Sequence, residues 1–138
     1  MKINPYLNFN GNCEEAFQFY SRILNGKDMR VMRYRDSPMG GQISESEKDL
    51  VVHARFVAGD TQIMGSDATG GRYNTPQGYA INIDVDSPEE AERIFAGLSE
   101  GGNVGMPIQE TFWAARFGMF TDRYGIPWMV NCEPSAAQ

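Results

Sequence analysis

Two segments of this chain follow the same plan at an offset of 75 residues. Residues 10–26 (NGNCEEAFQFYSRILNG) and residues 85–101 (VDSPEEAERIFAGLSEG) each place a capping residue before a helical pattern and a glycine after it. Each pattern carries a single apolar stripe, so each helix needs an apolar surface to lie on. This repeated element predicts that two similar halves complete one another in a single fold.

The expected ends of both helices follow from local chemistry. Asn12 and Ser87 are expected N-caps, and Glu15 and Glu90 stand three residues on, where a capping box needs them. We expect Gly26 to be a left-handed C-cap. The acidic residues at each start are therefore interpreted as caps and helix-dipole charges instead of a catalytic carboxylate pair.

Alternating apolar residues predict strands on both sides of each helix. The expected strands are 5–10, 29–34, 50–58 and 61–65 in the first half, and 79–85, 102–106, 116–122 and 126–132 in the second. Each half is a βαβββ module, and the fold class is α+β. We predict a single domain over 1–138, with modules at 1–66 and 78–133, a linker at 67–77 and a tail at 134–138.

Three stretches resemble one family: PYLNFNG at 5–11, HARFVAGDTQIMGSD at 53–67, and a W-x-x-R-F-G-x-x-x-D-x-x-G-x-x-W pattern over 113–128. They are similar to the PhnB-like branch of the vicinal oxygen chelate superfamily, which includes glyoxalases, dioxygenases and bleomycin-resistance proteins. The resemblance implies paired half-barrels, with helices outside mixed sheets and a ligand in the cleft between modules. It also makes a metal-independent binding protein for an apolar or aromatic small molecule our first hypothesis.

Metal-dependent members of this superfamily place His or Glu ligands at four positions. These positions fall here on Asn4 or Pro5, Ile63 or Met64, Tyr79 or Ala80, and Met129. None is a histidine or a carboxylate, and the chain has one histidine in all. Such side chains are poor ligands for these metals, so we predict no metal and no other cofactor.

Members of the branch have also carried a demethylubiquinone methyltransferase label. A cofactor site for S-adenosylmethionine usually needs a glycine-rich turn between a strand and a helix, with an acidic residue on the next strand. Here Gly70–Gly71 leads into RYNTP, and Gly101–Gly102 closes a helix. We therefore do not expect methyl transfer.

His53 is the candidate catalytic residue. It lies on a predicted strand, where Arg55 shares its face, and an imidazole opening into a cleft is a candidate acid or base. The alternative interpretation is a hydrogen-bonded histidine on a half-buried strand. If His53 is catalytic, the protein is an enzyme acting on a small carbonyl or phosphonate-related metabolite; whether it is an enzyme stays open.

The candidate ligand-binding residues are aromatic, thioether and cationic side chains: Trp113, Arg116, Phe117, Met64, Met129 and Trp128. Each has a structural alternative, with Trp128 in the core, the methionines as core filling and Arg116 paired with an acid such as Glu110. Asp67 and Asp122 end strands, where acids commonly serve as turn or cap residues.

The remaining expectations concern partners, location and oligomeric state. A formal net charge of −6 without a Lys/Arg cluster argues against nucleic acid as a partner. Two cysteines, no signal-peptide pattern and no membrane-length apolar run predict a cytoplasmic protein with reduced thiols. Open sheet edges predict a homodimer, and the polar loop 36–49 has no assigned role.

Overall fold

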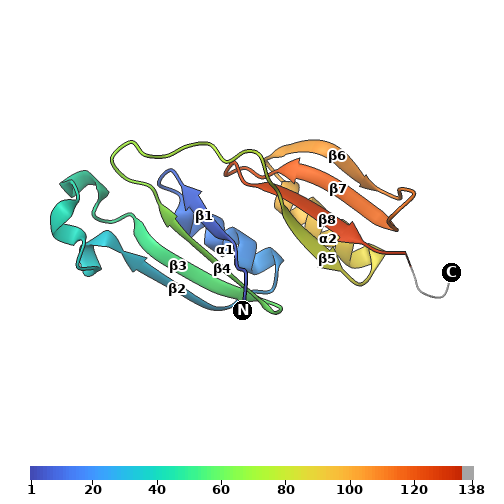
Figure 1. Ribbon diagram of the computed structural model, residues 1–138, viewed down its shortest axis with the longest axis horizontal. Helices are drawn as coiled ribbons and strands as arrows, with labels where there is room; N and C mark the ends of the chain where they lie inside the picture. Colours follow the sequence, from blue (N-terminus) through green and yellow to red (C-terminus); the bar gives the residue numbers. More distant parts are fainter. Residues whose placement is uncertain (135–138) are drawn as a thin grey trace. The chain divides into compact units, whose positions relative to one another are not determined.

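The computed structural model describes residues 1–134, and the chain divides into two compact units (Figure 1). The first unit is Met1–Asn74 and the second begins at Thr75, so the boundary lies inside the predicted linker 67–77. Within the described residues, no helix is long and apolar enough to span a membrane.

The first unit is one βαβββ module. Its elements are β1 (Tyr6–Phe9), α1 (Cys13–Ile23), β2 (Lys27–Arg33), β3 (Val51–Ala58) and β4 (Thr61–Asp67), and the sheet order is β1-β4-β3-β2. β1 and β4 are parallel, and the other pairs are antiparallel. Three short 3-10 helices lie between β2 and β3: η1 (Tyr34–Asp36), η2 (Gly40–Gln42) and η3 (Glu45–Glu47).

The second unit repeats this topology. Its elements are β5 (Ile81–Val85), α2 (Pro88–Ser99), β6 (Asn103–Gln109), β7 (Arg116–Thr121) and β8 (Pro127–Cys132), and the order is β5-β8-β7-β6. The two sheets also agree in register, since Met64 pairs with Arg55 and Met129 pairs with Met119 at the same place in each. The predicted α+β fold of two βαβββ modules is confirmed.

Each helix packs its apolar stripe on one face of its own sheet (Figure 1). In the first unit Phe17 of α1 meets Phe56 of β3 edge to face, with ring centroids 5.3 Å apart. In the second, Phe95 of α2 meets Phe120 of β7 at 5.2 Å. Burying each such ring contributes roughly 1.5–3 kcal/mol, so these contacts hold helix to sheet.

The N-terminal caps differ between the units. In α2, Ser87 Oγ accepts a hydrogen bond from the Glu90 backbone N–H at 3.1 Å, as predicted. In α1, Asn12 does occupy the N-cap position, but the predicted capping bond is wrong, because its side chain accepts no hydrogen bond from the helix. Asp67 Oδ1 instead accepts from the N–H groups of Gly11 and Cys13, at 3.0 and 2.9 Å. A carboxylate from β4 therefore caps the helix that follows β1.

The predicted C-cap of α1 is also displaced by one residue. Asn25, not Gly26, has the left-handed φ of 54°. Gly26 is required for a different reason: a Cβ there would lie 2.5 Å from Ser21 Oγ and 2.7 Å from Phe56 Cδ2. The glycine thus lets the chain leave α1 close against β3.

Candidate functional site

Alternate side chains of the first sheet point away from α1. Since side chains alternate along strands, and Ala54, Phe56 and Ile63 are buried on the helix side, their neighbours form the opposite face. We define the helix-free face as Tyr6, Asn8, His53, Arg55, Met64 and Ser66.

His53 is exposed on this face. Its ring lies near that of Tyr6, with centroids 5.9 Å apart. Within residues 1–134 the imidazole makes no hydrogen bond, so the alternative of a hydrogen-bonded, half-buried histidine does not describe it. Ala54 pairs with Gly65, and this register sets His53 beside Ser66.

A cavity of about 340 Å³ opens at the carboxyl ends of β1 and β4. Its lining residues are mostly polar and all belong to the first unit: Asn8, Tyr34, Ser66, Asp67, Ala68, Thr69, Arg72, Tyr73 and Asn74. Ser66 Oγ lies 3.4 Å from Asn8 Oδ1, so the two residues that join the helix-free face to the cavity also contact each other. The helix-free face and the cavity therefore form one continuous candidate site, and its lining is more polar than the methionine and aromatic positions led us to expect.

One wall of the cavity is supported by the loop between β2 and β3. The Tyr34 hydroxyl of η1 donates to the Asp67 carbonyl oxygen at 3.1 Å. Glu47 of η3 accepts from the Gly70 N–H at 3.1 Å. The loop whose role the sequence left open thus contacts the cavity wall at two points.

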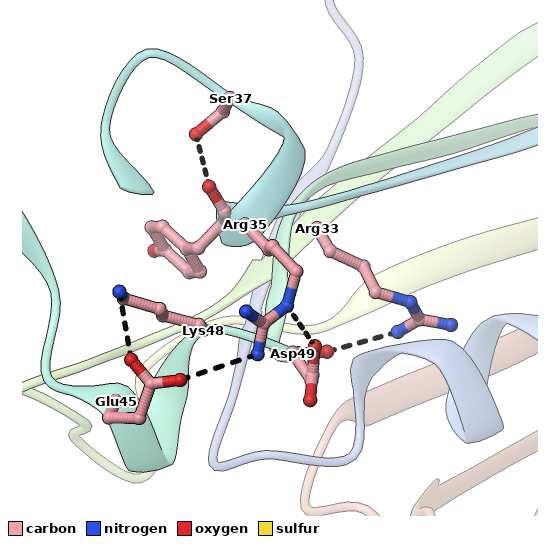
Figure 2. A network of polar contacts seen from close by, with 7 residues as sticks. Arg33, Arg35, Ser37, Glu45, Lys48 and Asp49 are labelled. Carbon is pink, nitrogen blue, oxygen red and sulfur yellow. Dashed lines mark hydrogen bonds and ion pairs between the residues drawn. The ribbon is translucent and has the colours of Figure 1, made fainter. Parts of the chain in front are cut away.

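Ion pairs hold this loop in shape (Figure 2). Arg35 Nε donates to Asp49 Oδ1 at 2.9 Å, and its Nη2 lies 3.9 Å from Glu45 Oε1. Lys48 Nζ lies 2.9 Å from the other Glu45 oxygen. Arg33 joins the group through the Asp49 carbonyl oxygen at 3.0 Å. Because these side chains are largely exposed, each pair contributes little alone, and the network acts as a set.

The predicted ligand residues of the second unit occupy different surroundings. Trp113 is 45% exposed, and its ring centroid lies 5.4 Å from that of Phe117. Arg116 pairs with an acid, but with Glu92 of α2 at 3.0 Å, not Glu110. The guanidinium therefore lies on the helix side of β7, while Phe117 pairs with Asn131 of β8.

Trp128 is only 1% exposed, and its Nε1–H donates to Asp122 Oδ2 at 2.8 Å. Asp122 Oδ1 also accepts from the N–H groups of Tyr124 and Ile126. Asp122 is thus a turn residue, as expected, and Trp128 belongs to this turn and the core. Met64 and Met129 are half-buried at the equivalent central positions of the two sheets.

The four positions that the superfamily uses for metal carry poor donors in this fold. Asn4 Oδ1 accepts from the Gln62 N–H at 3.3 Å, and Ile63 is buried on the helix side. In residues 1–134, no three His, Cys, Asp or Glu side chains lie close enough together to share a metal ion. Because amide and thioether groups bind these metals weakly, the residues do not fit the superfamily's metal.

The glycine pairs lie where the sequence placed them. Gly70 and Gly71 form a turn after β4, and the next regular element is β5, not a helix. Gly101, with φ 79°, follows the end of α2. Neither pair opens a helix after a strand.

Cys13 is buried in the first turn of α1, and Cys132 is buried in β8; both are free thiols. Burial raises the pKa of the Cys13 thiol well above its usual value, and the Asp67 and Glu14 carboxylates add to the effect. The thiolate is the nucleophilic form, so Cys13 is an inert core residue.

Sequence reasoning missed most of the cavity. Thr69 and Arg72 lie in the predicted linker 67–77, where no strand or helix pattern marks them, and Tyr34 ends the predicted strand 29–34, where nothing indicates a cavity. The only local sign was the Gly70–Gly71 pair, which indicates a tight turn that brings Thr69 and Arg72 together.

A family model described as 3-demethylubiquinone-9 3-methyltransferase matches residues 1–131. The Escherichia coli (strain K12) protein YjdN is 33% identical over 139 residues, which cover 95% of each chain. The crystal structure of PA1353 from Pseudomonas aeruginosa is 48% identical, covers 98% of this chain and 99% of that one, and has a TM-score of 0.87.

Two further structures extend the fold likeness. The PhnB protein from Bacillus cereus is 24% identical, with a TM-score of 0.77 over 96% of this chain and 99% of that one. A glyoxylase/bleomycin resistance protein/dioxygenase domain from Frankia sp. EAN1pec is 16% identical, with a TM-score of 0.67. The match covers 97% of this chain and 98% of that one. At these identities the likeness is one of fold.

Proposed function

Because the chain belongs to the 3-demethylubiquinone-9 3-methyltransferase family, the PhnB-like branch of the glyoxalase/bleomycin-resistance/dioxygenase superfamily, we propose that it binds a small molecule without the superfamily's metal. The site we propose is the cavity at the carboxyl ends of β1 and β4, together with the adjoining helix-free face. The earlier expectation of a cleft shared by both modules stays a prediction.

The observation that carries this proposal is the polar cavity at the carboxyl ends of β1 and β4. Its volume of about 340 Å³ lies within the range of small-molecule sites. Asn8, Ser66 and Asn74 offer amide and hydroxyl groups there, and their side chains are exposed or half-buried. Polar groups that converge on a cavity can fix the orientation of a bound ligand.

Metal independence is supported by donor chemistry. The side chains at the superfamily's ligand positions are amide, aliphatic and thioether groups, whereas the enzymes of the superfamily need imidazole or carboxylate. Methyl transfer receives no support from the glycine pairs described above. We also propose that the protein works in the cytoplasm, since two buried free thiols suit a reducing compartment.

A thermal-shift screen of a metabolite library, followed by calorimetry, tests the proposal. We expect a ligand that stabilises the protein in proportion to its concentration. Its binding should fall when Asn8 and Ser66 are both changed to alanine, and persist in the surface variant Arg30→Ala, whose side chain lies outside the cavity lining. A full library without a stabilising compound would count against a binding function.

A second candidate function is catalysis by His53. The observation that favours it is the exposed imidazole without a hydrogen-bond partner in residues 1–134, next to Tyr6 and beside Ser66. An imidazole so placed is available for proton transfer.

To test this, any compound found in the thermal-shift screen is incubated with the protein, and NMR shows whether the compound changes chemically. If His53 is the acid or base, conversion should fall about 100-fold or more in His53→Gln while binding persists. Equal conversion by the variant would remove His53 from any mechanism, and unchanged compound with wild-type protein would leave binding as the function.

A further inference from the structure

We propose that the ligand of this cavity carries an oxyanion, a carboxylate or a phosphate-type group, and that the Arg72 guanidinium binds it. The inference rests on the proposed binding function and names the chemical class of its ligand. Three observations support it: the geometry of one turn, the distribution of charge around the cavity, and the neutral polar groups beside Arg72.

A tight turn places Arg72 in the cavity. The Arg72 N–H donates to the Thr69 carbonyl oxygen at 3.3 Å, and the two central residues, Gly70 and Gly71, have φ values of 64° and 71°. Two positive φ values are typical of a type I′ turn, which reverses the chain tightly. Thr69 and Arg72 therefore line the same cavity.

The turn also sets the position of the guanidinium. A Cβ at Gly70 would lie 3.7 Å from Arg72 Nη1 and 3.8 Å from Cζ, so the side chain folds back over its own turn. Arg72 is exposed to solvent, and in this conformation its guanidinium lies over the turn that borders the cavity.

The acids near this turn already have partners. Asp67, the carboxylate in the cavity lining, is 2% exposed and accepts three backbone N–H bonds, from Gly11, Cys13 and Val51. Glu47 accepts from the Gly70 N–H and from the Ser44 hydroxyl. Within residues 1–134 Arg72 forms no ion pair, so no carboxylate of the described chain occupies its guanidinium.

The chemistry of the guanidinium then selects the ligand. It offers five N–H donors and no acceptor, in a planar fork that matches two oxygens of a carboxylate or phosphate. A neutral ligand that displaced water from the guanidinium would supply no negative charge in return, and a cationic ligand would be repelled. The side-chain amides of Asn8 and Asn74 can donate to the same oxyanion, while the Ser66 hydroxyl donates to Asn8 Oδ1 and fixes which way that amide faces.

Calorimetry and NMR with three small probes test this inference: benzoate, its neutral isostere benzamide, and phenylphosphonate. We expect both anions to bind, to shift the amide signals of Ser66 and Thr69, and to bind more weakly as salt is raised. Benzamide should bind about tenfold more weakly or worse. Comparison of benzoate with phenylphosphonate shows which type of oxyanion the site prefers.

Variants test whether anion binding depends on the Arg72 side chain itself or only on the positive charge of the protein. Arg72→Gln should lower the affinity for the anions about tenfold or more, Arg72→Lys should restore only part of it, and the control Arg30→Gln should leave it unchanged.

Equal affinity for benzoate and benzamide, no effect of Arg72→Gln, or no binding of either anion would overturn the inference. The metabolite screen decides the binding function separately: neutral ligands that depend on Asn8 and Ser66 would preserve the proposed function while the oxyanion inference failed.

Discussion

Asp67 shows how one side chain joins several segments of this fold. Its carboxylate accepts N–H bonds from the start of α1 and the start of β3, and its carbonyl oxygen accepts the Tyr34 hydroxyl. The first N–H groups of a helix lack intrahelical partners, so a buried carboxylate there removes a large desolvation cost. In the second unit, Asp122 binds three donors of its own turn in a comparable way. Both acids are structural.

We therefore predict that Asp67→Asn destabilises the protein by on the order of 3 kcal/mol, because the amide replaces one acceptor with a donor facing N–H groups. Urea unfolding followed by circular dichroism measures this. The control is Asp60→Asn, in the exposed turn between β3 and β4, which should change stability by less than about 0.5 kcal/mol. Similar losses in both variants would show that Asp67 has no special role.

At the scale of elements, the loop between β2 and β3 owes its shape to charges as well as to its 3-10 helices (Figure 2). A hydrogen bond from Arg35 and its positive charge lower the pKa of the Asp49 carboxyl below its usual value. Lys48 and then Arg35 lower the pKa of Glu45 in the same direction. Because the pKa is lower in the folded loop, the ion pairs stabilise the loop fully at pH values above the carboxyl's ordinary pKa of about 4. This stabilisation is lost as the pH falls through the lowered pKa.

We predict that Arg35→Gln raises the pKa of Asp49 towards its ordinary value, and that the loop is then looser already at neutral pH and changes less than in the wild type as the pH falls. NMR titration of the side-chain carboxyl carbons measures the pKa, and protease cleavage within residues 36–49 reports the loosening. Arg30→Gln, which removes an equal charge from β2, should affect neither. An unchanged Asp49 titration in Arg35→Gln would show that the pair does not form in solution.

At the scale of the molecule, each four-stranded sheet leaves two edges. β2 and β6 are irregular, with register shifts in both, and β6 also contains Pro107, features that discourage strand pairing. β1 and β5 pair without interruption with β4 and β8, so their outer edges are regular. A regular edge is the one more open to another chain.

We accordingly predict a homodimer, as expected from the sequence. Light scattering during size-exclusion chromatography should give twice the chain mass of 15.4 kDa, and dilution should eventually produce the single chain. A mass of one chain at every concentration would refute the dimer.

The sequence by itself determined the elements of this protein and their duplication. Strand and helix periodicities, the Ser87 cap and the glycine after α2 act over a few residues, so they can be identified before folding. The family resemblance rested on the same local patterns, and it was confirmed.

Only the tertiary structure decided how the candidate site is assembled. Asp67 accepts hydrogen bonds at the start of α1 from residues 54 and 56 positions away. Arg116 forms its ion pair with Glu92, 24 residues away, and not with Glu110, which is nearer in the sequence. Asn8, Ser66 and Arg72 share a cavity because β1 is parallel to β4 and a glycine turn follows β4. Contacts of this kind depend on strand register and turn geometry, which bring distant residues together and leave no periodic pattern in the chain.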